Sequence, residues 1–348
     1  MDVQSGIYRF EQAVKSLPPR PQGVLMALPA KVKNMAFEVR LRVDKPIVLT
    51  CPNQSWFVDI NSQLNNVPGG CFALTPQEME EAVLAMCSYS VHAHQNEIKN
   101  GYISLRGGHR AGVCGHAVLS DGKISAVRDI TSVNLRIARD IVGAADRVVN
   151  AAFLGRLQGV LVAGAPSSGK TTILRDLARQ LASGKMGRYY KVAVVDERGE
   201  IGAVHEGIPQ NDLGPCCDIL SGYPKGEGIL MAVRTLSPQL IICDEIGGEE
   251  EVTGMLDGLR CGVKVIASAH ADTMEELLGK RQIIRLLGEG AFSVIVMLGG
   301  AYEPGKVIQT IRTEDLRYEN GRYYVNSNSL FDDRDTHGVR FIGASAQA

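Results

Sequence analysis

A glycine-rich stretch in the middle of the chain has the spacing of a phosphate-binding loop. Two glycines separated by four residues are followed at once by lysine and threonine, a pattern that cradles the phosphates of a nucleotide. The apolar run 159–163 predicts a buried strand before the loop, and apolar residues at helical spacing predict a helix after it. The start of that helix adds unpaired N–H groups and a dipole that favours anions. We therefore expect a nucleoside triphosphate to be bound by Gly164, Ala165, Pro166, Ser167, Ser168, Gly169, Lys170, Thr171 and Thr172.

Four residues have expected roles in phosphoryl chemistry. Lys170 would reach the β- and γ-phosphates of ATP, and the hydroxyl of Thr171 would take a place on Mg²⁺. A second apolar run, 240–243, ends about 70 residues later at Asp244 and Glu245. We expect Asp244 to hold Mg²⁺, directly or through water, and Glu245 to orient and polarise the attacking water. ATP and Mg²⁺ are the cofactors that this pattern predicts.

Polar groups also follow two other predicted strands. Ligands bind at the carboxyl ends of strands in open α/β sheets, so side chains at these ends are candidates for the same site. His270 comes just after the predicted strand 263–268 and could sense the γ-phosphate by hydrogen bonding, or could be a surface loop histidine. The predicted strand 191–195 ends on three carboxylates: Asp196, Glu197 and Glu200.

Arginines are the candidates for a second cation in the site. The transition state of phosphoryl transfer spreads negative charge over three oxygens, and an arginine from outside the core can stabilise it. Residues 101–139 predict a small hairpin sheet that carries several arginines, whose alternative role is a solvated surface. Our candidates are Arg110 and Arg136, then Arg106 and Arg139, and Arg234 within the core.

Composition excludes some classes of protein and leaves others open. The chain has 348 residues, a net charge of −1 and 45% hydrophobic residues, which fits a globular protein of two domains. The near-neutral charge and the lack of a stripe of aromatic and basic residues argue against nucleic-acid binding. The first residues lack the features of a signal peptide, and no apolar stretch is long enough to span a bilayer. The eight cysteines are scattered, so we expect free thiols that are mostly buried, with no role assigned to Cys216-Cys217.

The pattern along the chain predicts four regions. Residues 1–34 are expected to form an N-terminal arm, with a short helix before the prolines at 18, 19 and 21, which interrupt any helix there. Residues 35–140 predict a small α/β domain that contains a helix begun by a capping box at 75–78. Strands and helices alternate over 141–325, which predicts a mostly parallel sheet. Residues 326–348 are polar and irregular and predict a disordered tail.

Five motifs together resemble the stage III sporulation protein AA family. They are the loop 164–171, the carboxylate run 196–200, the segments 208–212 and 234–238, and the Asp-Glu-Ile-Gly of 244–247; residues 107–112 also resemble that family. The family is in turn similar to the type II and type IV secretion ATPases. This resemblance implies a RecA-like fold and a homohexameric ring in which the hairpin sheet lies over the nucleotide of the same or a neighbouring subunit. It also implies a cytoplasmic ATPase on the mother-cell side of the forespore, associated peripherally with membrane proteins of a sporulation channel.

Carried over by residue, the resemblance assigns Lys170 and Thr171 to the Walker A motif and Asp244 and Glu245 to Walker B. Glu197 and Glu200 fall in the acidic box, and His270 in the histidine box. The acidic box reads Asp-Glu-Arg where secretion ATPases usually have Glu-Asp-Pro, and Walker B keeps an aspartate that many of them replace with glycine. No tetracysteine module is present. These departures leave open whether Glu197 or Glu245 activates the water.

Two other functions stay open on the sequence. A nucleic-acid translocase could use the same core, and stimulation of ATP hydrolysis by DNA or RNA would identify it. A switch that binds ATP without hydrolysing it is the third hypothesis, and the presence of Lys170, Asp244 and Glu245 speaks against it.

Overall fold

The computed structural model describes residues 3–52, 54–139, 141–153, 155–300 and 303–325. The chain divides into two compact units: the first comprises Met1–Gly143 and Asp196–Gly214, and the second Ala144–Val195 and Pro215–Ala348. Residues 196–214, which the sequence assigned to the second domain, thus group with the first unit. The expected disordered tail at 326–348 lies outside the described residues.

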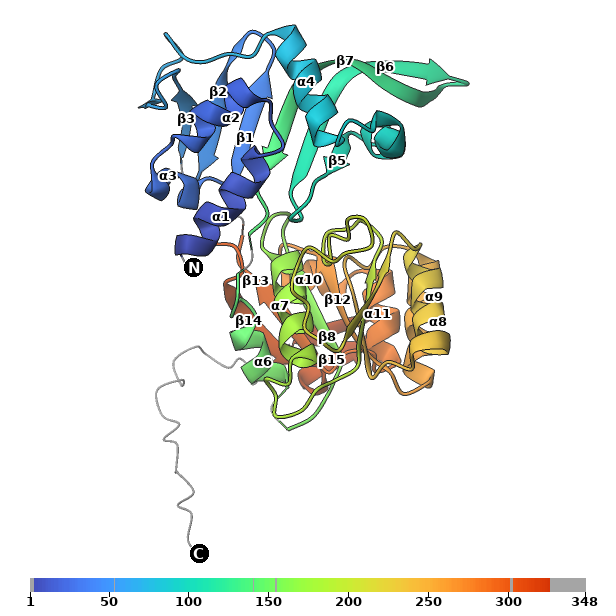
Figure 1. Ribbon diagram of the computed structural model, residues 1–348. Helices are drawn as coiled ribbons and strands as arrows, with labels where there is room; N and C mark the ends of the chain where they lie inside the picture. The colour runs from blue at the N-terminus through green and yellow to red at the C-terminus, as the bar shows by residue number, and fades with distance from the viewer. Residues whose placement is uncertain (1–2, 53, 140, 154, 301–302, 326–348) are drawn as a thin grey trace, which may run out of the picture. The chain divides into compact units, whose positions relative to one another are not determined.

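The first unit is built on an antiparallel sheet of seven strands in the order β4-β3-β2-β1-β7-β6-β5. Strands β6 and β7 form a long hairpin whose tip extends beyond the other strands of this sheet (Figure 1). The strands are β1 (Glu38–Arg42), β2 (Lys45–Cys51), β3 (Gln54–Val58), β4 (Leu64–Asn65), β5 (Tyr102–Ser104), β6 (Arg110–Ser120) and β7 (Lys123–Arg136).

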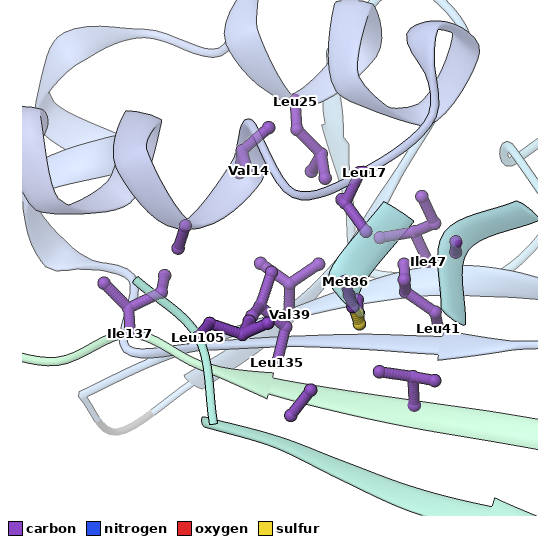
Figure 2. Close-up of a cluster of buried hydrophobic side chains, with 14 of the residues drawn as sticks. Val14, Leu17, Leu25, Val39, Leu41, Ile47, Met86, Leu105, Leu135 and Ile137 are labelled. Carbon is purple, nitrogen blue, oxygen red and sulfur yellow. The ribbon is translucent and has the colours of Figure 1, made fainter. Parts of the chain in front are cut away.

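Helices pack against this sheet and share its core. In the buried cluster of Figure 2, Val14, Leu17 and Leu25 from the helical region lie across from Val39 and Leu41 of β1. All five side chains are at most 3% exposed, so the helices bury the apolar side of the sheet. The helices of this unit are α1 (Val3–Val14), α2 (Pro19–Met26), α3 (Ala30–Met35), α4 (Pro76–Met86), the 3₁₀ turn η1 (Val91–His94) and α5 (Gln95–Lys99).

The N-terminal residues are more helical than the prolines suggested. We expected these prolines to interrupt any helix, but Pro19 is the first residue of α2 and Pro18 is its N-cap. Proline is tolerated in the first turn, where its missing N–H has no helical partner in any case. The short helical arm expected before the prolines is confirmed by α1, which ends at Val14, whereas the expectation that no helix passes through residues 18–21 was wrong. The capping box before α4 is confirmed, since Thr75 accepts from the Glu78 N–H and the Glu78 side chain accepts from the Thr75 N–H.

The second unit contains a mostly parallel sheet in the order β10-β9-β11-β12-β8-β13-β14. The pairs β9–β11, β11–β12, β12–β8 and β8–β13 are parallel, and β14 is antiparallel to β13. The mostly parallel sheet predicted from the alternation of strands and helices is confirmed for this unit. Its strands are β8 (Val160–Gly164), β9 (Val192–Asp196), β10 (Cys217–Ser221), β11 (Leu240–Cys243), β12 (Lys264–His270), β13 (Val294–Leu298) and β14 (Val307–Arg312).

Strands β8, β9, β11 and β13 are buried along their whole length, and the middle strand β12 is buried except at its two end residues, because helices cover both faces. A separate hairpin, β15 (Leu316–Glu319) and β16 (Arg322–Val325), follows the short turn η2 (Thr313–Asp315). The helices are α6 (Asp146–Ala152), α7 (Lys170–Ala182), α8 (Lys225–Leu236), α9 (Glu249–Arg260), α10 (Met274–Leu278) and α11 (Arg281–Gly288).

Candidate nucleotide-binding site

The glycine-rich loop joins β8 to the start of α7, as its sequence predicts (Figure 1). Gly169 caps the helix with a φ of +91°, a left-handed conformation that glycine adopts without strain. A Cβ on Gly169 would also lie 2.6 Å from the backbone nitrogen of Gly305, so no larger residue fits. The first N–H groups of α7 have no acceptor within the helix and face the loop. The local geometry is that of an anion cradle.

Lys170 folds back over this loop. Its ammonium group donates to the carbonyls of Gly164, at 2.8 Å, and Ala165, at 2.7 Å. It also lies 3.0 Å from Nδ1 of His270. Burial lowers the pKa of Lys170, although the nearby carboxylates of Glu245 and Asp272 act in the opposite sense. The lysine is therefore held over the loop by two backbone carbonyls and a ring nitrogen.

His270 connects the loop to the end of β11. It is the last residue of β12, which lies between β8 and β11 in the sheet. Its Nδ1 accepts from Lys170, because an ammonium group can only donate, and this leaves Nε2 to carry the proton. Nε2 lies 3.4 Å from Oε1 of Glu245. Lys170, His270 and Glu245 thus form one chain of contacts across three adjacent strand ends.

Asp244 and Glu245 follow β11 directly. Asp244 is only 4% exposed, whereas the side chain of Glu245 is 32% exposed and can meet a ligand. The backbone N–H of Glu245 donates to Oγ of Ser268 at 3.0 Å, which fixes the direction in which the strand ends. The structure therefore brings Lys170, Asp244, Glu245 and His270 to one edge of one sheet.

A buried cation beside this edge was missed by the sequence analysis. Lys225 is the first residue of α8, and its Nζ lies 3.3 Å from Oδ1 of Asp244 and 3.6 Å from Oε2 of Glu251. Burial acts most strongly and lowers the pKa of Lys225, but the neighbouring acidic groups, Asp244 foremost and then Glu251, together outweigh it, so the pKa is raised. The only signal in the sequence is a lysine after Pro224 at a helix start, which is too common to indicate a site.

The carboxylate run 196–200 serves a different local purpose. The carboxylate of Asp196 accepts from the backbone N–H groups of Glu200, Ile201 and Gly202, at 2.9, 3.1 and 2.7 Å. Glu200 pairs with Arg110, whose Nη1 lies 3.2 Å from Oε1 of the glutamate. Asp196 therefore closes a turn. Glu197 is exposed and belongs, with this turn, to the first unit.

The candidate arginines are in unlike environments. Arg110 lies opposite Arg136 in the register of β6 and β7, so the two side chains share one face of the sheet. Arg136 is 70% exposed, and Arg110 also stacks over Tyr102, 3.9 Å from its ring centre. Arg106 is exposed, just after β5.

Two other arginines fit the expected role less well. Arg139 donates to the backbone carbonyls of Gly6, Lys33 and Ala36, so its guanidinium group joins segments of the first unit. Arg234 lies in the last turn of α8, nine residues after Lys225 and about 13 Å away along the helix axis. The structure does not bring Arg234 to the edge of the sheet where Asp244 and Glu245 lie.

Comparison with known proteins identifies the family. The family model described as sporulation stage III, protein AA matches residues 11–316. The chain belongs to this family. Stage III sporulation protein AA of Bacillus subtilis strain 168 is 35% identical over 301 residues, which cover 86% of this chain and 94% of that protein. The plastid protein SEEDLING PLASTID DEVELOPMENT 1 of Arabidopsis thaliana is 29% identical over 172 residues, 48% of this chain and 24% of its own length.

Solved structures show the same fold at low sequence identity. The ATPase DotB of Yersinia pseudotuberculosis is 16% identical with a TM-score of 0.52, over 80% of this chain and 76% of its own. The pilus retraction motor PilT with bound ADP is 16% identical with a TM-score of 0.50, over 75% of this chain and 74% of its own. The chain thus shares the P-loop fold of these two proteins. Within the described residues, no helix is both long and apolar enough to cross a membrane.

Proposed function

We propose that this protein is a Mg²⁺-dependent ATPase of the secretion type that powers a sporulation channel between mother cell and forespore. The observation that carries the proposal is the contact chain from Lys170 through His270 to Glu245, placed beside a phosphate loop. It joins the residue types that bind, sense and hydrolyse a terminal phosphate. Membership in the sporulation family supports the biological setting.

The residues of the loop fit a bound triphosphate. Lys170 would exchange the carbonyls of Gly164 and Ala165 for the β- and γ-phosphate oxygens, a gain because those oxygens carry full charge. Among the residues that the structure describes, the buried Ser168 Oγ has no hydrogen-bond partner, and a small shift of the loop would supply one. Thr171 and Asp244 would hold Mg²⁺. When bound, the ion would neutralise negative charge that develops on the phosphates.

Glu245 is the residue that we propose to activate the attacking water. It lies on the same sheet edge as Lys170, its carboxylate is partly exposed, and Nε2 of His270 lies 3.4 Å from it. Glu197 folds with the first unit and remains the alternative. His270, placed between Lys170 and Glu245, would report the presence of the γ-phosphate to both.

The ring is a further part of the proposal. We propose a homohexamer in which Arg110 and Arg136 of one copy stabilise the phosphate in the next, a role that asks Arg110 to leave Glu200. Membrane proteins of the channel would be the docking partners, which would place the ATPase on the cytoplasmic face of the mother-cell membrane. We expect no nucleic acid as substrate.

Phosphate release from Mg²⁺–ATP by the purified protein tests this function. We expect the wild-type protein to hydrolyse ATP and Lys170→Ala to lose nucleotide binding, with no stimulation by DNA or RNA. Stimulation by either nucleic acid would favour a translocase. Tight ATP binding without any hydrolysis in the assembled protein would favour a switch and refute the proposal.

A further inference from the structure

Lys225 is a buried cation that no step of the proposed hydrolysis uses. Its side chain is only 5% exposed, and its Nζ donates to the backbone carbonyl of Glu245 at 2.5 Å. The carboxylates of Asp244 and Glu251 lie 3.3 and 3.6 Å away. A buried ammonium group is costly unless acceptors surround it. These acceptors all lie at the end of β11 or on the helix that follows it.

The stability of α8 does not explain this lysine. A positive charge in the first turn opposes the helix dipole, which favours anions there. Pro224, at the N-cap, provides no side-chain hydrogen bond that would compensate. Lys225 is therefore unfavourable for its own helix and favourable only for the carboxylates that it meets.

Glycines fix the place from which Lys225 reaches these groups. Helices α8 and α9 run side by side, and their first turns are in backbone contact (Figure 1). A Cβ on Gly226 would lie 2.9 Å from the carbonyl oxygen of Glu250, and a Cβ on Gly254 would lie 2.9 Å from that of Gly226. Side chains at either position would force the helices apart and withdraw the lysine.

Both backbone polar groups of Glu245 have hydrogen-bond partners, one from Ser268 and one from Lys225. The N–H donates to Oγ of Ser268 and the carbonyl accepts from Lys225. The next residue, Ile246, donates to the carbonyl of Ser268 at 2.8 Å. With these peptide groups fixed, the backbone of Glu245 is held at a place from which its carboxylate reaches to 3.4 Å from Nε2 of His270.

We propose that Lys225 is a positioning residue for this site. It holds the carbonyl of Glu245 and balances the buried charge of Asp244 and Glu251, so that the carboxylate of Glu245 stays in place for catalysis. This inference rests on the proposed ATP hydrolysis.

Turnover of Lys225 variants tests the positioning role. A displacement of about 1 Å at a reacting group can cost on the order of 10²-fold in rate, so we expect Lys225→Met to lose about that much in kcat. The KM for ATP should stay within about threefold, because the phosphate loop is untouched. Lys225→Arg keeps the charge and the donors and should recover a large part of the loss. Lys191→Met, which removes an exposed lysine of the same unit, should behave like the wild type.

A second measurement needs no nucleotide. Lys225→Met should lower the melting temperature, because it leaves buried carboxylates without their counter-charge. Adding Asp244→Asn should raise it again, since the neutral amide no longer needs the ammonium group. If Lys225→Met does not fold, Lys225→Gln, which keeps a donor for the Glu245 carbonyl, should show the same split between kcat and KM.

Three results would overturn the inference. The first is a wild-type kcat in Lys225→Met. The second is an equal loss of kcat in Lys225→Met and Lys225→Arg together with a raised KM for ATP. The third is a melting temperature that does not recover when Asp244→Asn is added to Lys225→Met. A wild-type protein that does not hydrolyse ATP would refute the proposed function and this inference together. An active wild type with an unaffected Lys225→Met would refute the inference alone.

Discussion

Two strands of this protein end in Asp-Glu, and the structure uses the two pairs differently. After β9, Asp196 binds three backbone N–H groups of the turn that follows it. After β11, Asp244 and Glu245 instead meet side chains, namely Lys225 and His270. The first pair shapes a turn and the second faces a possible ligand. We infer from this difference that the pair after β11 is the better candidate for a site.

The largest expected effect separates the two glutamates. Glu245→Gln should lower turnover by about 10⁴-fold, at the upper end of what general-base catalysis contributes, and should still bind ATP. Glu197→Gln is the matched control and should stay within about twofold of wild type. Phosphate release at saturating ATP measures both. If only Glu197→Gln lost turnover, Glu197 and not Glu245 would be the residue that activates the water.

The next effect concerns Arg110, which pairs with Glu200 of the carboxylate run after β9. Arg110→Ala should lower turnover by about 10³-fold, because an arginine supplied to the phosphate is worth at least that much. Mixed with inactive Glu245→Gln, it should regain partial activity, since hybrid interfaces combine one intact arginine with one intact glutamate. Specific activity of the wild type should rise with protein concentration. Activity independent of concentration and no recovery in mixtures would remove the ring from the account.

A third effect is on stability and tests the role of Asp196. Asp196→Ala removes the acceptor for three N–H groups and should lower the free energy of unfolding by about 2–3 kcal/mol. Asp212→Ala is a suitable control, because this exposed carboxylate accepts only from Gly214 among the contacts that the structure describes. Its cost should be below about 1 kcal/mol. Thermal unfolding measures both free energies. Equal melting temperatures for the two variants would contradict the claim that Asp196 stabilises the turn after β9.

The smallest effect is expected at Cys243, inside β11 next to the second pair. Burial raises the pKa of this thiol to about 12, so it is neutral and acts as an apolar group. Cys243→Val should change stability by less than about 1.5 kcal/mol and leave turnover unchanged. Loss of activity in a folded Cys243→Val protein would show that the thiol takes part in the chemistry.

The sequence predicted the parts of the site that depend on local pattern. The loop and the ends of β11 and β12 could be located because buried strands are continuous apolar runs and the glycine spacing is distinctive. Lys225 could not be found this way, since its role depends on the close contact of α8 and α9 at Gly226 and Gly254.

Other misses have the same cause. Arg139 was a candidate for the phosphate, but its partners, such as the Gly6 carbonyl, come from residues far away in the chain. The cysteines were expected to be mostly buried, yet only Cys51, Cys87 and Cys243 are. Burial of a single side chain depends on tertiary packing, which no local pattern encodes.

A crystal structure with Mg²⁺ and a non-hydrolysable ATP analogue tests the central claim most directly. We expect Lys170 to leave the carbonyls of Gly164 and Ala165 and to contact the β- and γ-phosphates. Asp244 and Thr171 should approach the Mg²⁺ ion, and Glu245 should face the γ-phosphate through a water. An analogue bound away from the loop, or one that leaves Lys170 on its two carbonyls, would contradict the account.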